Sequence, residues 1–114
     1  MWIRRKVKPG FKLGKKLGHP TINFSVGSFG QHFSAGVYTC KVRINGKTYK
    51  GALFFGPKLN EPGKVLEIFV LDFSDHLYGR FVSFKVGRKI RKPIKFTSLA
   101  ELKKQIQKDI ASVV

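Results

Sequence analysis

Hydrophobic and polar residues alternate along much of the chain, which predicts strands rather than helices. The clearest alternation covers residues 36–44, where one face carries Tyr38, Cys40, Val42 and Ile44. Asn45-Gly46 follows directly, and this dipeptide favours the tight two-residue turn of a β-hairpin. Residues 47 to about 55 are therefore predicted to return as the second strand of that hairpin.

The rest of the chain adds more strands and then a single helix. Residues 65–73 and 80–86 have strand-like patterns, with a turn at Ser74-Asp75-His76 between them. After Ser98 the apolar residues recur at helical spacing, as Leu99, Leu102, Ile106, Ile110 and Val113. Ser98 and Glu101 form a capping box, which marks the start of that helix. The pattern predicts a mainly β fold, a small antiparallel barrel closed on one side by the C-terminal helix.

Composition favours one domain over residues 1–114. The chain has 114 residues, of which 42% are hydrophobic and 11 are Phe, so one modest core is expected. No run approaches the roughly 18 apolar residues of a membrane span, and the basic N-terminal residues lead into Gly10 rather than an apolar signal core. We expect a cytoplasmic monomer. The single cysteine, Cys40, excludes an internal disulfide, and its phase in the strand predicts a buried, inert thiol.

The charge is strongly positive. Lys and Arg number 23 against 6 Asp and Glu, for a net charge of +17, and the first acidic residue is Glu61. Such a field attracts polyanions of any kind. The basic residues of 4–16 and 85–95 are either solvated surfaces or contacts to a nucleotide or an RNA. No zinc spacing or RNA-recognition signature accompanies them, so a nucleic-acid function is not predicted, and a non-catalytic barrel that binds RNA or another polyanion stays the alternative.

The segment Gly14-Lys15-Lys16-Leu17-Gly18-His19-Pro20-Thr21-Ile22-Asn23 carries the candidate chemistry. If residues 21–24 are extended, Thr21 and Asn23 point to the same face, and their oxygens could share one hard cation such as Mg²⁺. In the segment before them, the glycines Gly10, Gly14 and Gly18 let the backbone approach a phosphate closely. Lys15 and Lys16 supply positive charge beside it. A glycine-rich turn that only leads into a strand is the structural alternative.

The chain resembles the riboflavin kinase domain family from about residue 7 to about residue 110. The resemblance rests on five co-linear blocks: Gly10-x-x-x-Gly14-Lys15-x-Leu17-Gly18-x-Pro20-Thr21-x-Asn23, Gly36-Val37-Tyr38, Glu67-Ile68-Phe69-Val70-Leu71-Asp72-Phe73, Leu77-Tyr78-Gly79 and Ile90-Arg91. It implies a small closed antiparallel Greek-key β-barrel with a C-terminal α-helix. Bacterial members are often fused to an adenylyltransferase domain that this sequence does not show. We therefore expect the reaction to stop at FMN.

The resemblance also implies a reaction and a base. The γ-phosphoryl group of ATP is expected to pass to the terminal ribityl hydroxyl of riboflavin, and a carboxylate should accept the hydroxyl proton. Glu67 aligns with the glutamate that the family uses for catalysis. Its strand face is shared with Val65, Phe69 and Leu71, and such apolar neighbours should raise its pKa toward neutrality. The structural alternative is a glutamate at the barrel end that pairs with a Lys or Arg.

The remaining roles are carried over by resemblance. The residues implied for ATP binding are Gly10, Lys15, Thr21, Asn23, Val70 and Tyr78. Thr21 and Asn23 are also the implied ligands of the metal, Mg²⁺ with Zn²⁺ or Mn²⁺ as alternatives. Arg91 and Phe96 match flavin-side positions, with core packing as the alternative for Phe96 and for Tyr78. The chain reads Leu53-Phe54-Phe55-Gly56 where members often carry Asn-Ile-Gly, a difference expected to reshape a substrate pocket.

Overall fold

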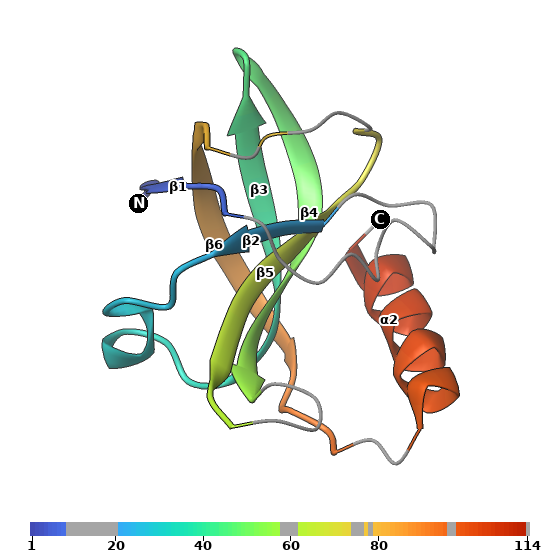
Figure 1. Cartoon of the computed structure of the whole chain (residues 1–114). Helices are drawn as coiled ribbons and strands as arrows, with labels where there is room; N and C mark the ends of the chain where they lie inside the picture. Colours follow the sequence, from blue (N-terminus) through green and yellow to red (C-terminus); the bar gives the residue numbers. More distant parts are fainter. Residues whose placement is uncertain (9–20, 58–61, 74–76, 78, 96–97, 114) are drawn as a thin grey trace.

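The computed structural model describes residues 1–8, 21–57, 62–73, 77, 79–95 and 98–113. Within them, six strands and one C-terminal helix form the domain drawn in Figure 1. The elements are β1 (Ile3–Lys6), β2 (Thr21–Phe24), a 3₁₀ turn η1 (Phe29–Gln31), β3 (Gly36–Ile44), β4 (Lys47–Pro57), β5 (Lys64–Val70), β6 (Phe81–Arg91) and α2 (Leu99–Val113).

The strands pair in the order β1-β6-β3-β4-β5-β2, and every pair is antiparallel. Strands β3, β4 and β5 follow one another, and β6 returns beside β3, which is the Greek-key arrangement. The sheet curls so that the chain after β1 meets β2, where the N–H of Lys8 donates to the carbonyl of Asn23 at 2.8 Å. The predicted mainly β antiparallel fold with a C-terminal helix is confirmed; the strands form a curled half-barrel, and among the described residues one bridge, Lys8 with Asn23, joins its two edges.

Local sequence signals predicted the first hairpin correctly but not the end of strand β5. Asn45 and Gly46 have φ of 50° and 80°, the positive values that a type I′ turn requires, and Ile44 pairs with Lys47 across it. Strand β5 ends at Val70, so the predicted end at residue 73 is wrong. Asp72 has φ of 59° in the turn that follows, and this left-handed conformation stops the extended backbone.

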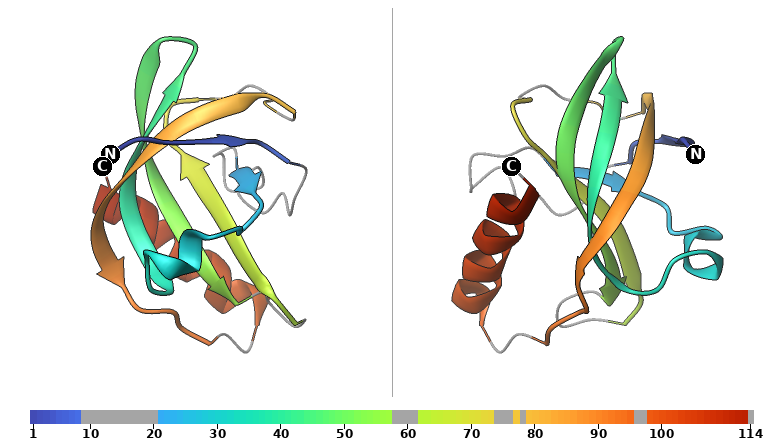
Figure 2. Two further views of the ribbon diagram at one scale, coloured as in Figure 1. Left: turned by 90° about the vertical axis from the view of Figure 1, so that its left-hand side faces the viewer. Right: turned by 180° about the vertical axis from the view of Figure 1, so that it is seen from behind.

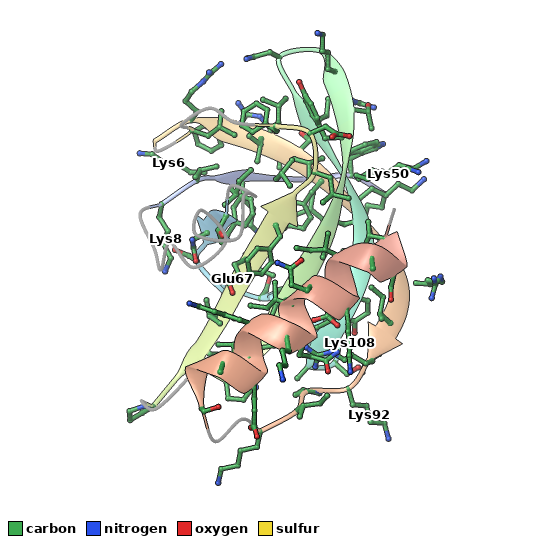
Figure 3. The ribbon with its side chains drawn as sticks, turned by 90° about the vertical axis from the view of Figure 1, so that its right-hand side faces the viewer. Lys6, Lys8, Lys50, Glu67, Lys92 and Lys108 are labelled. Carbon is green, nitrogen blue, oxygen red and sulfur yellow. The ribbon has the colours of Figure 1, made fainter. Side chains whose placement is uncertain are left out.

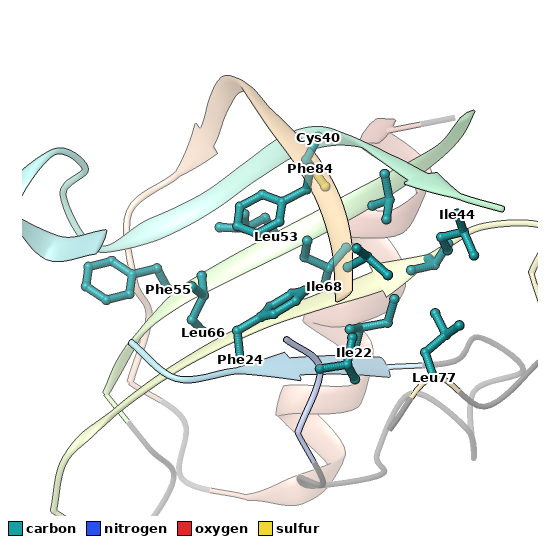
Figure 4. Packing of buried hydrophobic residues seen from close by; sticks show 14 of the residues in the cluster. Ile22, Phe24, Cys40, Ile44, Leu53, Phe55, Leu66, Ile68, Leu77 and Phe84 are labelled. Atoms are coloured by element: carbon teal, nitrogen blue, oxygen red, sulfur yellow. The ribbon is translucent and has the colours of Figure 1, made fainter. Parts of the chain in front are cut away.

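The inner faces of the strands enclose the main core, which Figure 4 shows from close by. Its largest side chains are aromatic rings that bury each other, with Phe24, Phe29, Phe55 and Phe84 fully enclosed. Cys40 lies in this core as a free thiol, and burial raises its pKa to about 12. The prediction of a buried, inert cysteine is confirmed.

A second, smaller apolar cluster lies on the outer face of the sheet, beneath α2. It joins Ala52, Phe69 and Leu71 to Ile106 and Ile110, with Leu102 and Val113 packed at its edge. Figure 2 shows the helix on this side of β3 and β4. The predicted apolar stripe of the helix is therefore its contact with the sheet. No helix in the described part of the chain is long and apolar enough to span a membrane.

The cap of α2 gives a stability prediction. The N–H of Glu101 donates to the Ser98 hydroxyl at 3.2 Å, which satisfies one amide of the first turn, as the capping box predicted. Ser98→Ala should lower the free energy of unfolding by about 1 kcal/mol in urea denaturation. Ser112→Ala is the matched control, because that hydroxyl only donates to the Lys108 carbonyl within the helix, and its loss should be nearly neutral. Equal effects of the two substitutions would contradict a cap at Ser98.

Candidate functional site

The strand register aligns one row of side chains across five strands. Arg91 of β6 lies opposite Val37 of β3, Val37 lies opposite Phe54 of β4, Phe54 opposite Glu67 of β5, and Glu67 opposite Asn23 of β2. Directly opposite residues in an antiparallel sheet project from the same face. That face is the outer one, since the residues on either side of Glu67 and Asn23 fill the barrel core.

Thr21, Asn23 and Glu67 are brought together by the pairing of β2 with β5. Asn23 and Glu67 are directly opposite each other. Thr21, two residues before Asn23, projects from the same face of β2. Asn23 is only 3% exposed, although its side chain is polar. Figure 3 shows Glu67 on β5, seen from the side on which α2 lies. The predicted common face of Thr21 and Asn23 is confirmed, and the register adds a carboxylate to it.

These three side chains offer oxygen donors of the kind that Mg²⁺ prefers. A hydroxyl, an amide carbonyl and a carboxylate are hard ligands, and Mg²⁺ usually keeps several waters beside one or two protein groups. Among the described residues, no three His, Cys, Asp or Glu side chains form a cluster that could hold a metal. A cation at this place would therefore depend on the mixed set of Thr21, Asn23 and Glu67.

Glu67 titrates near neutral pH. Burial disfavours its charged form and raises its pKa from 4.5 to about 7, as the apolar neighbours in the sequence predicted. Phe69 and Leu71, on the same face of the strand, are buried in the cluster beneath α2. Across the described residues, no Lys or Arg forms an ion pair with Glu67, so the described structure gives no support to the alternative of a paired surface glutamate.

The Phe54 ring lies in the same row, next to Glu67. Its Cζ atom is 3.2 Å from the point that a Cβ atom would occupy at Gly56, so the ring lies close over the backbone of its own strand. A side chain at position 56 would displace it. Phe54 belongs to the segment that departs from the family pattern, and the register places that departure directly beside the predicted base.

Arg91, a predicted flavin-side residue, holds the helix to the sheet. Its Nε and Nη2 atoms donate to Oδ1 and Oδ2 of Asp109, each at 2.8 Å, and Gln105 Nε2 donates to the same Oδ1 at 3.0 Å. Sequence reasoning did not single out Asp109. The signal was available, because Asp109 is an acidic residue between Ile106 and Ile110 on the apolar face of the helix.

Val70, another predicted site residue, does not join this row. Val70 is fully buried in the barrel core, so its side chain lies on the opposite face of β5 from Glu67. Gly10, Lys15, Tyr78 and Phe96 lie outside the described residues. Their roles stay predictions.

A small antiparallel barrel with a near-neutral carboxylate beside hard oxygen donors has a site suited to phosphoryl-transfer chemistry. The chain belongs to the riboflavin kinase family, because the family model described as riboflavin kinase matches residues 1–114. The family resemblance is thereby confirmed over the whole sequence.

Similar proteins agree with this family. A bifunctional riboflavin kinase/FMN adenylyltransferase of Haemophilus influenzae is 38% identical over 92% of this chain and 35% of its own length. An RNA-binding riboflavin kinase of Bacillus subtilis is 37% identical over 97% of this chain and 49% of its own length. The chain thus spans about a third to a half of the length of these relatives.

Two solved structures share the fold. The crystal structure of a riboflavin kinase from Trypanosoma brucei superposes with a TM-score of 0.60 at 22% identity, over 96% of this chain and 74% of that chain. A structure titled macrolide-efflux protein, from Streptococcus pneumoniae, gives a TM-score of 0.77 at 24% identity, over 98% of this chain and 38% of that chain. At these identities the likeness supports the fold alone.

The raised pKa of Glu67 predicts a pH-dependent stability. Below about pH 4.5 the carboxyl is protonated in both the folded and unfolded states. As the pH rises to about 7, unfolding releases a proton and stability falls. Glu67→Gln removes this titration, so it should gain about 3 kcal/mol in free energy of unfolding, relative to the parent, between about pH 4 and about pH 8.5.

Urea denaturation of ligand-free protein at several pH values measures this difference. Glu101→Gln is the matched control, since it makes the same substitution at an exposed position of α2, where glutamine can also complete the capping box. A pH-independent difference for Glu67→Gln would show that the Glu67 carboxyl does not titrate near neutrality.

The pairing of Arg91 with Asp109 predicts a second stability effect. Asp109→Asn leaves a guanidinium that is only 15% exposed without its counter-charge, which should cost about 3–5 kcal/mol in thermal or urea denaturation. The double variant Arg91→Met/Asp109→Leu should recover most of this loss, because it leaves no buried charge. Asp72→Asn, at an exposed turn, should have little effect. A loss as small as that of Asp72→Asn would mean that the pair does not hold the helix.

Proposed function

We propose that this chain is an ATP-dependent riboflavin kinase, which transfers the γ-phosphoryl group of ATP to the 5′-hydroxyl of the ribityl chain and produces FMN and ADP. One observation carries the proposal: Glu67, with a pKa of about 7, lies directly across the strand pair from the buried Asn23, in a chain of the riboflavin kinase family. The similar proteins named as riboflavin kinases support it, although they are longer proteins.

Glu67 acts as the general base. Phosphoryl transfer needs the nucleophilic hydroxyl to lose its proton as the new O–P bond forms, and a carboxylate within hydrogen-bond reach can accept that proton. A base works best when its pKa lies near the working pH, because it is then both unprotonated and basic enough. Partial burial between Asn23 and Phe54 gives Glu67 this property.

Thr21 and Asn23 hold the divalent cation, Mg²⁺ in the first instance, together with the nucleotide. The cation supplies charge neutralisation at the phosphates of ATP. The two side chains fit this role because their oxygens lie on one face of β2, and because burial of Asn23 fixes its position. Gly10, Lys15, Val70 and Tyr78 are proposed to line the nucleotide, with Val70 limited to its backbone because its side chain faces the core.

Arg91, Phe54 and Phe96 are proposed to border the flavin. Arg91 stands at the far end of the row that contains Glu67, and its guanidinium is held in place by Asp109. Phe54 offers an aromatic ring between Arg91 and Glu67, at a position where the isoalloxazine or the ribityl chain could lie against it.

A non-catalytic barrel that binds a polyanion is the competing function. It accounts for the net charge of +17 but gives no reason for a hydroxyl, an amide and a near-neutral carboxylate to share one face. Thr21, Asn23 and Glu67 together therefore favour the kinase.

The test is FMN formation from riboflavin, ATP and Mg²⁺, measured chromatographically with controls that lack ATP or metal. Glu67→Gln should reduce kcat by about 10²–10⁴-fold, the usual contribution of a general base, while Glu101→Gln leaves it unchanged. For the parent enzyme, kcat/KM should rise with pH through about 7 with the slope of one proton and then level off, since the base must be unprotonated. FMN formation by Glu67→Gln at the parent rate would rule out this base. No FMN from the parent under any divalent metal would overturn the kinase.

A further inference from the structure

The part of the outer face of the sheet that α2 leaves uncovered is basic and carries exposed aromatic surface. Figure 1 shows β1 and α2 on opposite sides of the barrel. Six exposed cations project from this outer face: Arg4, Lys6, Lys41, Arg43, Lys50 and Lys85. We call these six, with the rings of Trp2 and Phe81, the basic platform. None of β1, β3, β4 and β6 contains an Asp or Glu.

The strand register arranges five of the six cations in two neighbouring rows, and Lys6 lies beside Phe81. In one, Arg4 of β1 and Arg43 of β3 lie on either side of Ser83 of β6. In the other, Lys41 of β3 lies between Lys50 of β4 and Lys85 of β6. The rows are two residues apart along the strands, which is about 7 Å. The platform therefore presents two parallel lines of positive charge.

Two arginines of the platform stack on aromatic rings. The guanidinium carbon of Arg4 lies 4.2 Å from the ring centre of Phe81, and that of Arg43 lies 4.1 Å from the ring centre of Trp2. Phe81 is 53% exposed, which is unusual for so large an apolar side chain. Aromatic rings and guanidinium planes are the surfaces on which unpaired bases stack in single-stranded nucleic-acid sites.

The charges of the platform are not balanced by the protein. Lys41 faces a lysine on each neighbouring strand, and like charges directly opposite each other destabilise a sheet. In the described part of the chain, no acidic side chain pairs with any of the six cations. A bound polyanion would relieve this repulsion and release its own counterions.

We propose that the basic platform binds single-stranded nucleic acid, with bases stacked on Phe81 and Trp2 and backbone phosphates along the two rows of cations. A duplex would keep its bases away from the rings, and a lipid headgroup has no base to stack. The stacked arginines and rings lie away from Glu67, because Arg43 is six residues, about 20 Å, along β3 from Val37 in the row of Glu67, whereas Lys50 is four residues along β4 from Phe54 in that row.

Trp2 is the only tryptophan, so its fluorescence reports binding at the platform directly. The full-length chain is titrated with oligoadenylate and oligodeoxyadenylate of about 12 nucleotides, inorganic polyphosphate of similar charge, and phosphatidylserine vesicles. Both oligonucleotides should quench Trp2 and bind more tightly than polyphosphate, and a difference between them would identify RNA or DNA as the preferred ligand. Polyphosphate or vesicles binding as tightly as the oligonucleotides would overturn the proposal, since charge alone would then explain the affinity.

Matched variants separate stacking from charge. Phe81→Ser should weaken oligoadenylate binding by at least about fivefold, whereas Ile94→Ser, which removes another exposed apolar side chain, should not. Lys41→Gln/Lys85→Gln should lower the slope of log K against log salt by about 1.4, the loss expected for two phosphate contacts. Lys104→Gln/Lys108→Gln removes the same charge from the exposed surface of α2 and should change the slope much less.

Each platform variant should retain its cooperative thermal unfolding and its FMN formation, which shows that folding and the kinase site are intact. Equal losses of affinity in the platform pair and in the helix pair would overturn the proposal, as would full affinity in Phe81→Ser.

Discussion

The pairing of β5 with its two neighbours decides where the chemistry of this barrel can lie. Side chains alternate between the two faces of a strand, so Leu66 and Ile68 enter the core only if Glu67 points outward. A slip of one residue would place the carboxylate in the barrel and two aliphatic side chains outside it. The same register sets Asn23 opposite Glu67, so the packing of the core and the composition of the site are fixed together.

The outer face of the sheet has two parts, one covered by the helix and one that carries cations. Over β3, β4 and β5, the helix covers Ala52, Phe69 and Leu71 with its own apolar stripe. Over β1, β6 and the far end of β3, the face is instead covered with cations and remains in water. Glu67 lies on the same face as Phe69, which the helix covers, and burial there raises its pKa.

Local patterns predicted the parts of this structure that depend on neighbours in sequence. The Asn45-Gly46 hairpin, the capped helix after Ser98 and the burial of Cys40 all follow from turn chemistry or periodicity. Strand β1 was not predicted, because its four residues contain three cations and acquire their structure from β6. The pair of Arg91 and Asp109 joins residues 18 apart on different elements, and periodicity carries no information about such a contact.

The sequence predicted which described residues form the candidate site, but it predicted their arrangement only in part. Thr21 and Asn23 were expected on one face, and Glu67 was expected among apolar residues, since both follow from alternation along a strand. Their proximity depends on the pairing of β2 with β5, which lie 40 residues apart in the chain and could be aligned only through the family resemblance. Val70 was placed at the nucleotide by resemblance. Its side chain points into the core, because it lies two residues from Ile68 and so on the face of β5 opposite to that of Glu67.

The burial of Cys40 has a practical consequence. A thiol with a pKa of about 12 is almost entirely protonated at neutral pH, and its place in the core keeps reagents away while the barrel is intact. Unfolding exposes it and returns its ordinary reactivity. Because the chain has no second cysteine, the rate at which a thiol reagent modifies the protein reports the opening of the barrel, without any engineered label.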